Sequence, residues 1–288
     1  MPELPEVETM RRGIAPAIGA TLAGIERPRC RLKPITVSPR LADFRRRATG
    51  RRIVATERMG KRVALRLDSG AAIVFEPRMT GLVLLARPPD AEHLRFRVTL
   101  SGVGAEQLLF WDRRGLGSVR LVLPEQWDEL YGPGKLGPDA LTIGLSELQQ
   151  RLSTTRRAIK VALLDQRAVA GIGNLYAAEI LHAAGVHPAL PCEQITPSAW
   201  QRLHTALHAV LEQAIHYEGS TLADGTYRNA LNNPGSYQNH HRVYARAGLL
   251  CRSCGTGIVQ RIVQAQRSTF YCPVCQPRRR GRRRHAEA

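Results

Sequence analysis

Four of the six cysteines form two Cys-x2-Cys pairs near the C-terminus. Cys251 and Cys254 make the first pair and Cys272 and Cys275 the second, with seventeen residues between the pairs. This spacing is typical of a zinc ribbon, in which each Cys-x2-Cys turn presents two thiolates to one tetrahedral ion. Because cysteines fill all four ligand positions, no position remains for a substrate. The spacing therefore predicts one structural zinc ion.

Arg267 lies between the two cysteine pairs, in the sequence Gln264–Tyr271. If this segment is a β-hairpin, Arg267 lies near its tip. A guanidinium on a hairpin held by zinc is well placed to bind a phosphate or a base. A solvated turn residue is an equally good interpretation of Arg267 when it is considered alone.

The N-terminus offers a second kind of chemistry. Methionine before proline is normally removed, which would leave Pro2 with a free secondary amine. An α-amino group has a pKa of about 8, so part of it is neutral and nucleophilic at pH 7. Such an amine can attack an aldehyde carbon and form an iminium. Glu3 and Glu6 could move protons beside it, although acidic residues at a helix start are also ordinary capping residues.

Charge narrows the class of partner. The 288 residues include 42 Lys and Arg against 24 Asp and Glu, a net charge of +18. Nucleic acid is the expected partner, and an anionic membrane surface is the second possibility. The sequence contains no apolar run long enough to span a membrane and no secretory signal, so we expect a cytoplasmic protein that associates with the nucleoid through DNA.

The chain divides into a β-rich and a helical part. Strands are expected at 51–58, 61–67, 71–75, 82–85, 94–100 and 107–111, after one short helix near Pro5. These runs favour a β-sandwich or barrel. Helices are expected at 145–152, 159–164, 174–184 and 200–217. The polar segment 219–241 shows no periodicity and is expected to be a long loop.

The N-terminal Met-Pro-Glu-Leu-Pro-Glu-Val-Glu-Thr, together with a zinc finger containing Gln-Arg-Ser-Thr-Phe-Tyr-Cys, resembles the formamidopyrimidine-DNA glycosylase family. The similarity runs from Pro2 to Cys275. It implies an α+β multidomain fold. Residues 1–130 would form a catalytic β-sandwich with its N-terminal helix, and 131–245 a helix-two-turn-helix domain with a lesion-capping loop. Residues 246–276 would form the zinc finger and 277–288 a basic tail.

The resemblance also implies an activity. The chain would be a monomeric base excision repair enzyme that binds damaged double-stranded DNA without an organic cofactor. It would remove oxidised purines, such as 8-oxoguanine and formamidopyrimidines, and nick the strand by β,δ-elimination. Pro2 would attack C1′, Glu3 would be its acid/base partner and Glu6 the second carboxylate. Lys61 would assist β-elimination, and Arg267 would grip phosphates and aid the δ step.

Further residues match DNA contacts of the family. Met79 corresponds to the side chain that fills the gap left by the flipped base, and Arg114 to the arginine that faces the orphaned cytosine. Lys160 and Asn174 match phosphate ligands, and His93 and Arg156 match other DNA contacts. Leu116 replaces the family's wedge aromatic residue; leucine can fill a gap but cannot stack.

Two alternatives remain open from the sequence. The segment Phe75–Arg78 and the loop 219–241 depart from the family pattern, and substrate choice resides there. One alternative is therefore a glycosylase similar to endonuclease VIII, which acts on oxidised pyrimidines. The other is a zinc-ribbon protein that binds DNA without catalysis, although binding alone does not require Pro2, Glu3 and Lys61.

Overall fold

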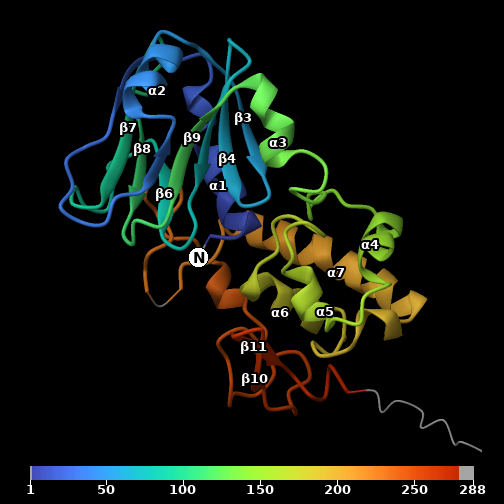
Figure 1. The fold of residues 1–288 in the computed structure, drawn as a ribbon. Helices are drawn as coiled ribbons and strands as arrows, with labels where there is room; N and C mark the ends of the chain where they lie inside the picture. The colour runs from blue at the N-terminus through green and yellow to red at the C-terminus, as the bar shows by residue number, and fades with distance from the viewer. Residues whose placement is uncertain (1, 223, 279–288) are drawn as a thin grey trace, which may run out of the picture. The chain divides into compact units, whose positions relative to one another are not determined.

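The computed structural model describes residues 2–222 and 224–278. The chain forms two compact units (Figure 1). The first contains the residues up to 143 together with 165–173 and 211–240, and the second contains 144–164, 174–210 and the chain from 241 onward. Met1 and residues 279–288 of the predicted basic tail lie outside the described residues.

Two sheets form the sandwich of the first unit and share one apolar core. One sheet has the order β1-β7-β8-β6 and the other the order β2-β9-β5-β4-β3, with all neighbours antiparallel except β2 and β9. The strands are β1 (Thr21–Glu26), β2 (Thr36–Ser38), β3 (Ile53–Met59), β4 (Arg62–Leu67), β5 (Ala72–Glu76), β6 (Gly81–Leu84), β7 (Leu94–Ser101), β8 (Gln107–Asp112) and β9 (Ser118–Val122). The predicted β-sandwich is confirmed.

Helix α1 (Leu4–Gly13) packs against strands β3, β4 and β6. Pro5 suits its first turn, since the missing N–H is not needed there. Val7 and Met10 are fully buried on the face that meets the core. This packing holds the start of α1, next to Pro2, against the sandwich.

Two short helices and two 3-10 turns also belong to the first unit. Helix α2 (Leu41–Ala48) inserts Phe44 into the core, and α3 (Trp127–Tyr131) covers the outer face of β4 and β5. Single turns of 3-10 helix lie at Ala15–Ala17 and Pro124–Gln126. Arg66 lies over the Trp127 ring at 3.5 Å, which attaches α3 to the sheet.

The helical part is α4 (Leu145–Leu152), α5 (Ile159–Leu163), α6 (Asn174–Ala183) and α7 (Pro197–His216), with a 3-10 turn at Cys192–Gln194. The four predicted helices are present. Helix α7 begins with Pro197 in its first turn, and the Thr196 carbonyl accepts the Trp200 N–H at 3.0 Å. No helix in the described ranges has the length and apolarity that a membrane span requires.

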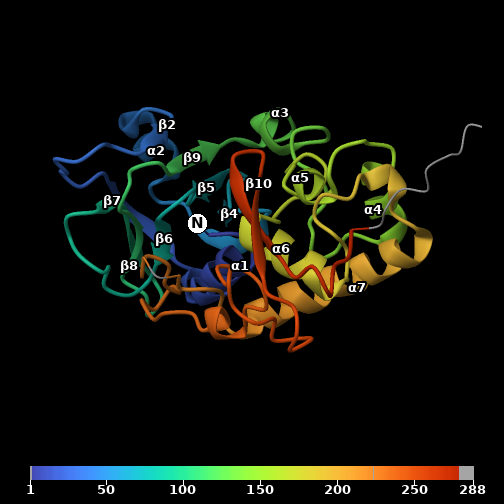
Figure 2. The same ribbon diagram turned by 90° about the horizontal axis from the view of Figure 1, so that it is seen from below.

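The zinc-finger hairpin consists of β10 (Gln260–Gln264) and β11 (Arg267–Tyr271), drawn in red in Figure 2. Ala265 and Gln266 form the turn, both with positive φ. Arg267 therefore directly follows the tip, as predicted. The described residues of 219–241 contain one 3-10 turn, Tyr237–His240, and otherwise form a loop, also as predicted.

A buried ion-pair cluster fixes α1 within the first unit. Glu8 accepts hydrogen bonds from Arg11 and Arg12 on its own helix and from Arg58 of β3 at 3.1 Å. Arg58 also donates to Asp139 at 2.8 Å. Burial alone would raise the pKa of Glu8, but the hydrogen bonds from Arg11 and Arg12 outweigh it, and the pKa falls to about 2.

We expect Glu8→Gln to lower the free energy of unfolding by about 2 kcal/mol near pH 7, because Arg58 would remain buried without this carboxylate. The folded pKa lies below the ordinary value of 4.5, so the stabilisation is present above pH 4.5 and is lost as the pH falls through about 2. Urea unfolding from pH 7 to pH 2 measures the difference. Glu106→Gln, at an exposed carboxylate, is the control. A difference that does not change across this range would contradict the role of Glu8.

Candidate functional site

The start of α1 holds two buried carboxylates next to Pro2. Glu3 and Glu6 are each 3% exposed, and Pro2 is buried as well. The Glu3 N–H donates to Oε2 of Glu6 at 2.9 Å. The other oxygen of Glu6 accepts the Ser220 N–H at 2.9 Å. Glu6 therefore joins the helix start to the loop 219–241, a link across more than two hundred residues that no local sequence signal indicates.

A glycine-rich segment packs directly on this helix start. The Leu4 N–H donates to the Gly171 carbonyl at 3.0 Å. A methyl group on Gly173 would lie 2.2 Å from Cδ of Glu3 and 2.4 Å from one of its oxygens. Only glycine leaves room for the carboxylate there. The backbone of 171–173 thus packs against Glu3, a contact between distant parts of the chain that no local sequence signal indicates.

Lys61 lies in the tight turn between β3 and β4, and its side chain is half-buried. The preceding Gly60 approaches Ala170 and Gly171, with a hypothetical Cβ 3.4 Å from the Gly171 nitrogen. The same Gly171 accepts the hydrogen bond from Leu4. The structure therefore brings the Lys61 turn and the start of α1 to one short segment of backbone.

Met79 and Arg114 occupy neighbouring loops of the first unit. Met79 is 38% exposed, Arg114 is exposed and Leu116 is half-buried. The Arg114 N–H donates to Oγ1 of Thr80, the residue after Met79, at 3.0 Å. This hydrogen bond thus connects the two loops that carry Met79 and Arg114, whose side chains are predicted to enter the DNA duplex.

His93 lies at the start of β7 and is half-buried. Its Nδ1 is 2.8 Å from Asp90, and its ring meets Trp111 edge-on with centroids 5.5 Å apart. The His93 carbonyl accepts the Asp112 N–H at 3.0 Å. The imidazole is therefore oriented by its neighbours. It lies beside the end of β8, the strand that leads to Arg114.

A small cavity of about 10 Å³ lies between Pro2, Met79 and the loop residues Ser220, Thr226 and Tyr227. Its volume suits about one water molecule. Tyr227 is 5% exposed, and its hydroxyl donates to the Glu218 carbonyl at 2.9 Å. The loop thus borders Pro2 closely in this conformation.

The second unit connects Lys160, Asn174 and the zinc-finger hairpin. Lys160 is fully buried, and its Nζ donates to Oδ1 of Asn174 at 2.5 Å. The Asn174 amide donates in turn to the Ser268 carbonyl at 3.0 Å. Ser268 follows Arg267, which is exposed. Arg156 lies apart from this chain of contacts, with its side chain 91% exposed and 3.6 Å from Glu193.

Glu179 is a structural carboxylate that the sequence analysis did not identify. It is 1% exposed on α6 and accepts the backbone N–H groups of Arg242, Val243 and Tyr244 at 2.9, 3.0 and 2.7 Å. Burial raises its pKa, and the three hydrogen bonds oppose that rise. Glu179 therefore anchors the segment that leads into the zinc finger.

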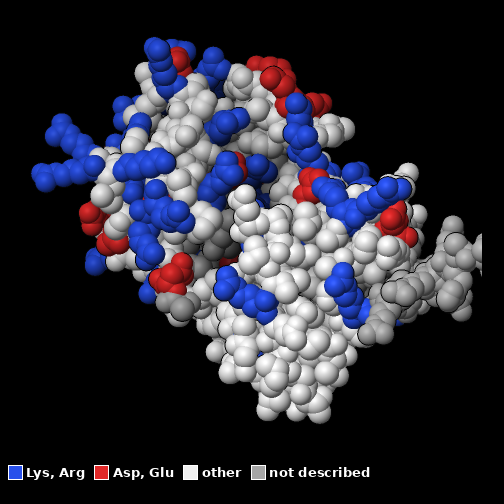
Figure 3. All heavy atoms as spheres, turned by 60° about the horizontal axis from the view of Figure 1, so that its bottom comes forward, with Lys and Arg blue, Asp and Glu red and all other residues white. Residues whose placement is uncertain are grey.

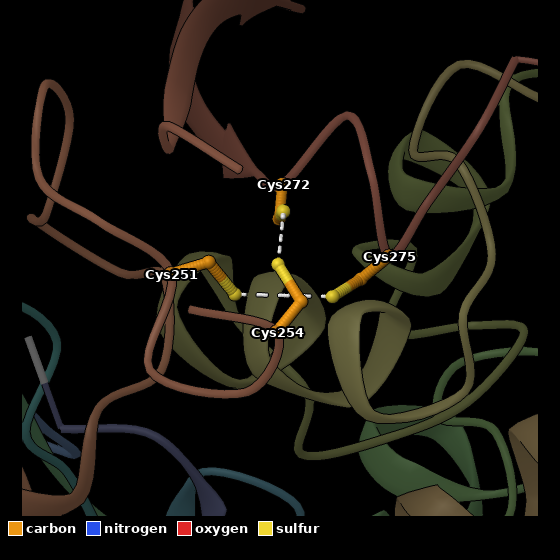
Figure 4. Close-up of side chains that lie close together, drawn as sticks. All are labelled: Cys251, Cys254, Cys272 and Cys275. Carbon is orange, nitrogen blue, oxygen red and sulfur yellow. Dashed lines mark hydrogen bonds between the residues drawn. The ribbon is translucent and has the colours of Figure 1, made fainter. Parts of the chain in front are cut away.

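The four cysteines of the two Cys-x2-Cys pairs converge, and their sulfurs all lie within 4.8 Å of one another (Figure 4). The Cys251–Cys275 and Cys254–Cys272 sulfurs are each 3.8 Å apart. Zinc with Zn–S bonds of about 2.3 Å in a tetrahedron separates its sulfurs by about 3.8 Å. The four cysteines thus fit one structural zinc ion, as predicted.

Neighbouring groups support the thiolates. The Gly257 N–H donates to the Cys254 sulfur at 3.3 Å, and Nε2 of His182 lies 3.4 Å from the Cys251 sulfur. Burial, with a smaller effect from Arg242, lowers the pKa of His182 to about 4. The imidazole is therefore neutral and can donate a hydrogen bond to a zinc-bound thiolate.

Comparisons with protein families agree with this arrangement. Residues 1–119 match the formamidopyrimidine-DNA glycosylase N-terminal domain, and 136–225 match the H2TH domain of the same enzymes. Residues 248–278 match a zinc finger found in FPG and IleRS. A formamidopyrimidine-DNA glycosylase of Chloroflexus aggregans is 40% identical over 282 residues, covering 96% of this chain and 98% of the relative.

Solved structures give the same result. The MutM (Fpg) protein of Thermus thermophilus is 37% identical with a TM-score of 0.82, over 96% of this chain and 98% of that one. A Lactococcus lactis Fpg variant in complex with DNA containing Fapy-dG is 30% identical with a TM-score of 0.85, over 96% of this chain and all of that one.

The zinc site generates a prediction at Gly257. A methyl group there would lie 2.5 Å from the Cys272 sulfur, so we expect Gly257→Ala to displace this ligand and weaken zinc binding on the order of tenfold or more. Release of zinc to a chromogenic chelator measures the effect. Gly104→Ala is the control, since nothing lies within 4 Å of its Cβ position. Equal zinc release from the two variants would show that the close contact does not shape the site.

Proposed function

Because the chain belongs to the formamidopyrimidine-DNA glycosylase family, we propose that it excises oxidised purines from damaged double-stranded DNA and then cleaves the strand. The observation that carries this proposal is the buried Glu3 carboxylate at the helix start next to Pro2, held against Gly173. Solved Lactococcus lactis relatives hold DNA with Fapy-dG and DNA with an abasic site. The substrates of these relatives match the two steps proposed.

The first step needs Pro2 as the N-terminal residue, with its secondary amine free of a proton. The nitrogen attacks C1′ of the damaged nucleotide while the glycosidic bond breaks. The electron pair of that bond leaves with the base, which takes up a proton. The attacking nitrogen loses its proton, and its electron pair then expels O4′ from C1′. O4′ takes up a proton, which leaves an iminium between Pro2 and the opened sugar.

Glu3 is the proposed acid/base partner of Pro2. Its carboxyl is shielded from bulk water, and its place beside the amine suits proton exchange with the sugar. Lys61, on the turn that shares Gly171 with α1, assists removal of the C2′ proton during β-elimination. The two oxygens of Glu6 accept the backbone N–H groups of Glu3 and Ser220. Glu6 therefore holds the residue after Pro2 and the loop 219–241 together.

Phosphate binding is assigned to basic residues of both units. Lys and Arg predominate over Asp and Glu on the face drawn in Figure 3. Arg267 grips the phosphates around the lesion and aids δ-elimination. Buried Lys160 donates a hydrogen bond to Asn174, and the two residues complement a phosphate at the start of α6. His93 and Arg156 add further DNA contacts.

Met79, Arg114 and Leu116 fill the duplex when the damaged nucleotide leaves the stack, and Arg114 pairs with the orphaned cytosine. The cavity between Pro2 and Tyr227 is much smaller than a purine. A base therefore requires the loop 219–241 to withdraw from Pro2.

The domain division proposed from the sequence is kept: catalytic sandwich 1–130, helix-two-turn-helix domain 131–245, zinc finger 246–276 and basic tail 277–288. One family match lies within each of the first two proposed domains, at 1–119 and 136–225, and a third, at 248–278, covers most of the zinc finger. We also propose that the protein acts as a monomer and works on the nucleoid in the cytoplasm, because its substrate is chromosomal DNA.

Oxidised pyrimidines are the second candidate substrate. A solved Lactococcus lactis relative holds DNA containing an oxidised pyrimidine, with 30% identity to this chain and a TM-score of 0.84. The loop 219–241, which departs from the family pattern, borders the cavity next to Pro2. Lesion choice must therefore be measured directly.

Borohydride trapping tests the proposal. A duplex with 8-oxoguanine opposite cytosine should give a covalent adduct, because borohydride reduces the iminium to a stable amine. Pro2→Gly keeps only a primary amine on a flexible residue and should lower trapping on the order of 10²-fold or more. DNA affinity should stay close to that of the wild type, since the charges are unchanged.

Duplexes with dihydrothymine and 5-hydroxycytosine, run in parallel, separate the outcomes. Trapping on these alone would move the protein to the oxidised pyrimidines. Equal trapping by Pro2→Gly and the wild type would contradict Pro2 as the nucleophile. The mass of the intact protein should also show that Met1 has been removed.

A further inference from the structure

A buried carboxylate outside the catalytic residues lies beneath the two loops that carry Met79 and Arg114. Asp112 ends β8 and is fully buried. Its Oδ1 accepts the hydroxyl of Thr80 and the Arg114 N–H, the latter at 3.2 Å. Its Oδ2 accepts the Gly117 N–H at 2.7 Å. Both oxygens of one side chain thus hold three points on the two loops.

Thr80 completes the connection. It is 3% exposed, and its hydroxyl donates to Asp112 while accepting the Arg114 N–H at 3.0 Å. Thr80 directly follows Met79, so one hydroxyl joins the backbone beside Met79 to the backbone of Arg114. Met79 and Arg114 themselves remain exposed. The hydrogen bonds therefore fix where the side chains start and leave their ends free to meet a ligand.

The loop before Thr80 has a backbone conformation that needs such support. Arg78 has φ of +54°, a value that residues with a side chain rarely adopt. Such residues persist where the surrounding contacts over-determine them, and they cluster at ligand-binding sites. No local sequence feature, such as a glycine at position 78, explains this conformation.

A buried arginine supports the other loop from below. Arg95 is 2% exposed on β7, and its Nε donates to the Asp112 carbonyl at 2.8 Å. Its Nη2 donates to the Arg113 carbonyl at 3.5 Å. A guanidinium and a carboxylate, both buried, therefore hold the chain on either side of Arg113, and Arg114 leaves from a fixed point.

We propose that Thr80 and Asp112 are positioning residues that fix Met79 and Arg114 at one separation, so that the two side chains enter the duplex as one unit and Arg114 can select the base opposite the lesion. This inference rests on the proposed function. It assigns part of the opposite-base specificity to a hydroxyl and a carboxylate that face inward and are buried from solvent.

The chemistry of the carboxylate explains why its close analogues cannot replace it. Each oxygen of Asp112 faces a backbone N–H, from Arg114 on one side and Gly117 on the other. A backbone donor cannot be reversed, so the amide of asparagine would turn its NH2 group toward one of them. Valine at position 80 keeps the shape of threonine but removes the bridging hydroxyl. Serine keeps the hydroxyl.

The experiment compares single-turnover excision of 8-oxoguanine opposite cytosine and opposite adenine. Thr80→Val should lower the cytosine-to-adenine rate ratio by about tenfold, which corresponds to about 1.4 kcal/mol. Asp112→Asn should lower it in the same direction. Thr80→Ser should restore the ratio, and Thr99→Val, at an exposed position on β7, should leave it unchanged. Thermal unfolding of each variant checks that it is folded.

A second substrate separates the inference from the proposed function. Cleavage of an abasic site in single-stranded DNA requires the Pro2 amine but offers no opposite base and no gap in a duplex. Thr80→Val should lose far less activity there than on the 8-oxoguanine duplex. A wild-type ratio in folded Thr80→Val, or equal losses on both substrates, would overturn the inference. A wild-type protein inactive on both substrates would overturn the proposed function itself.

Discussion

The contact between the Gly173 backbone and the Glu3 carboxylate is the constraint on which the site depends. Pro2, the proposed nucleophile, would act as the first residue after loss of Met1, so residues later in the chain must fix its position. Glu3 is the N-cap of α1, and its carboxylate occupies the space that the missing Cβ of Gly173 leaves open. The Gly171 carbonyl fixes Leu4 from the same segment. A distant segment of the chain thus holds the two residues that follow Pro2.

Buried carboxylates recur around this site in a chain of net charge +18. Each carries a different task, because its partners differ. Glu6 and Asp112 accept backbone N–H groups and position loops, whereas Glu8 is paired with arginines and fixes α1 to the sandwich. Burial keeps these anions away from DNA phosphates while the exposed surface stays basic. A strongly basic protein can therefore place acid/base chemistry next to a polyanion.

Elements with a strong local signal could be predicted from the sequence. The β-branched runs predicted β3 to β8, and the cysteine spacing predicted the zinc site. Strand β2 has three partly exposed residues, and α2 carries three arginines in its eight, so neither shows a clear apolar pattern. The burial of Lys160 and the contact between Glu6 and Ser220 depend on tertiary packing. Residue types indicate possible chemistry, but only the fold shows which of them meet.

The most direct measurement of the central claim is the single-turnover rate of adduct formation by Gly173→Ala on the 8-oxoguanine duplex. The added methyl group must displace the Glu3 carboxylate, so the rate should fall on the order of 10²-fold in a protein that still folds and binds DNA. Gly104→Ala, at an open position, should react as the wild type does. A wild-type rate in Gly173→Ala would show that this close contact does not position the nucleophile.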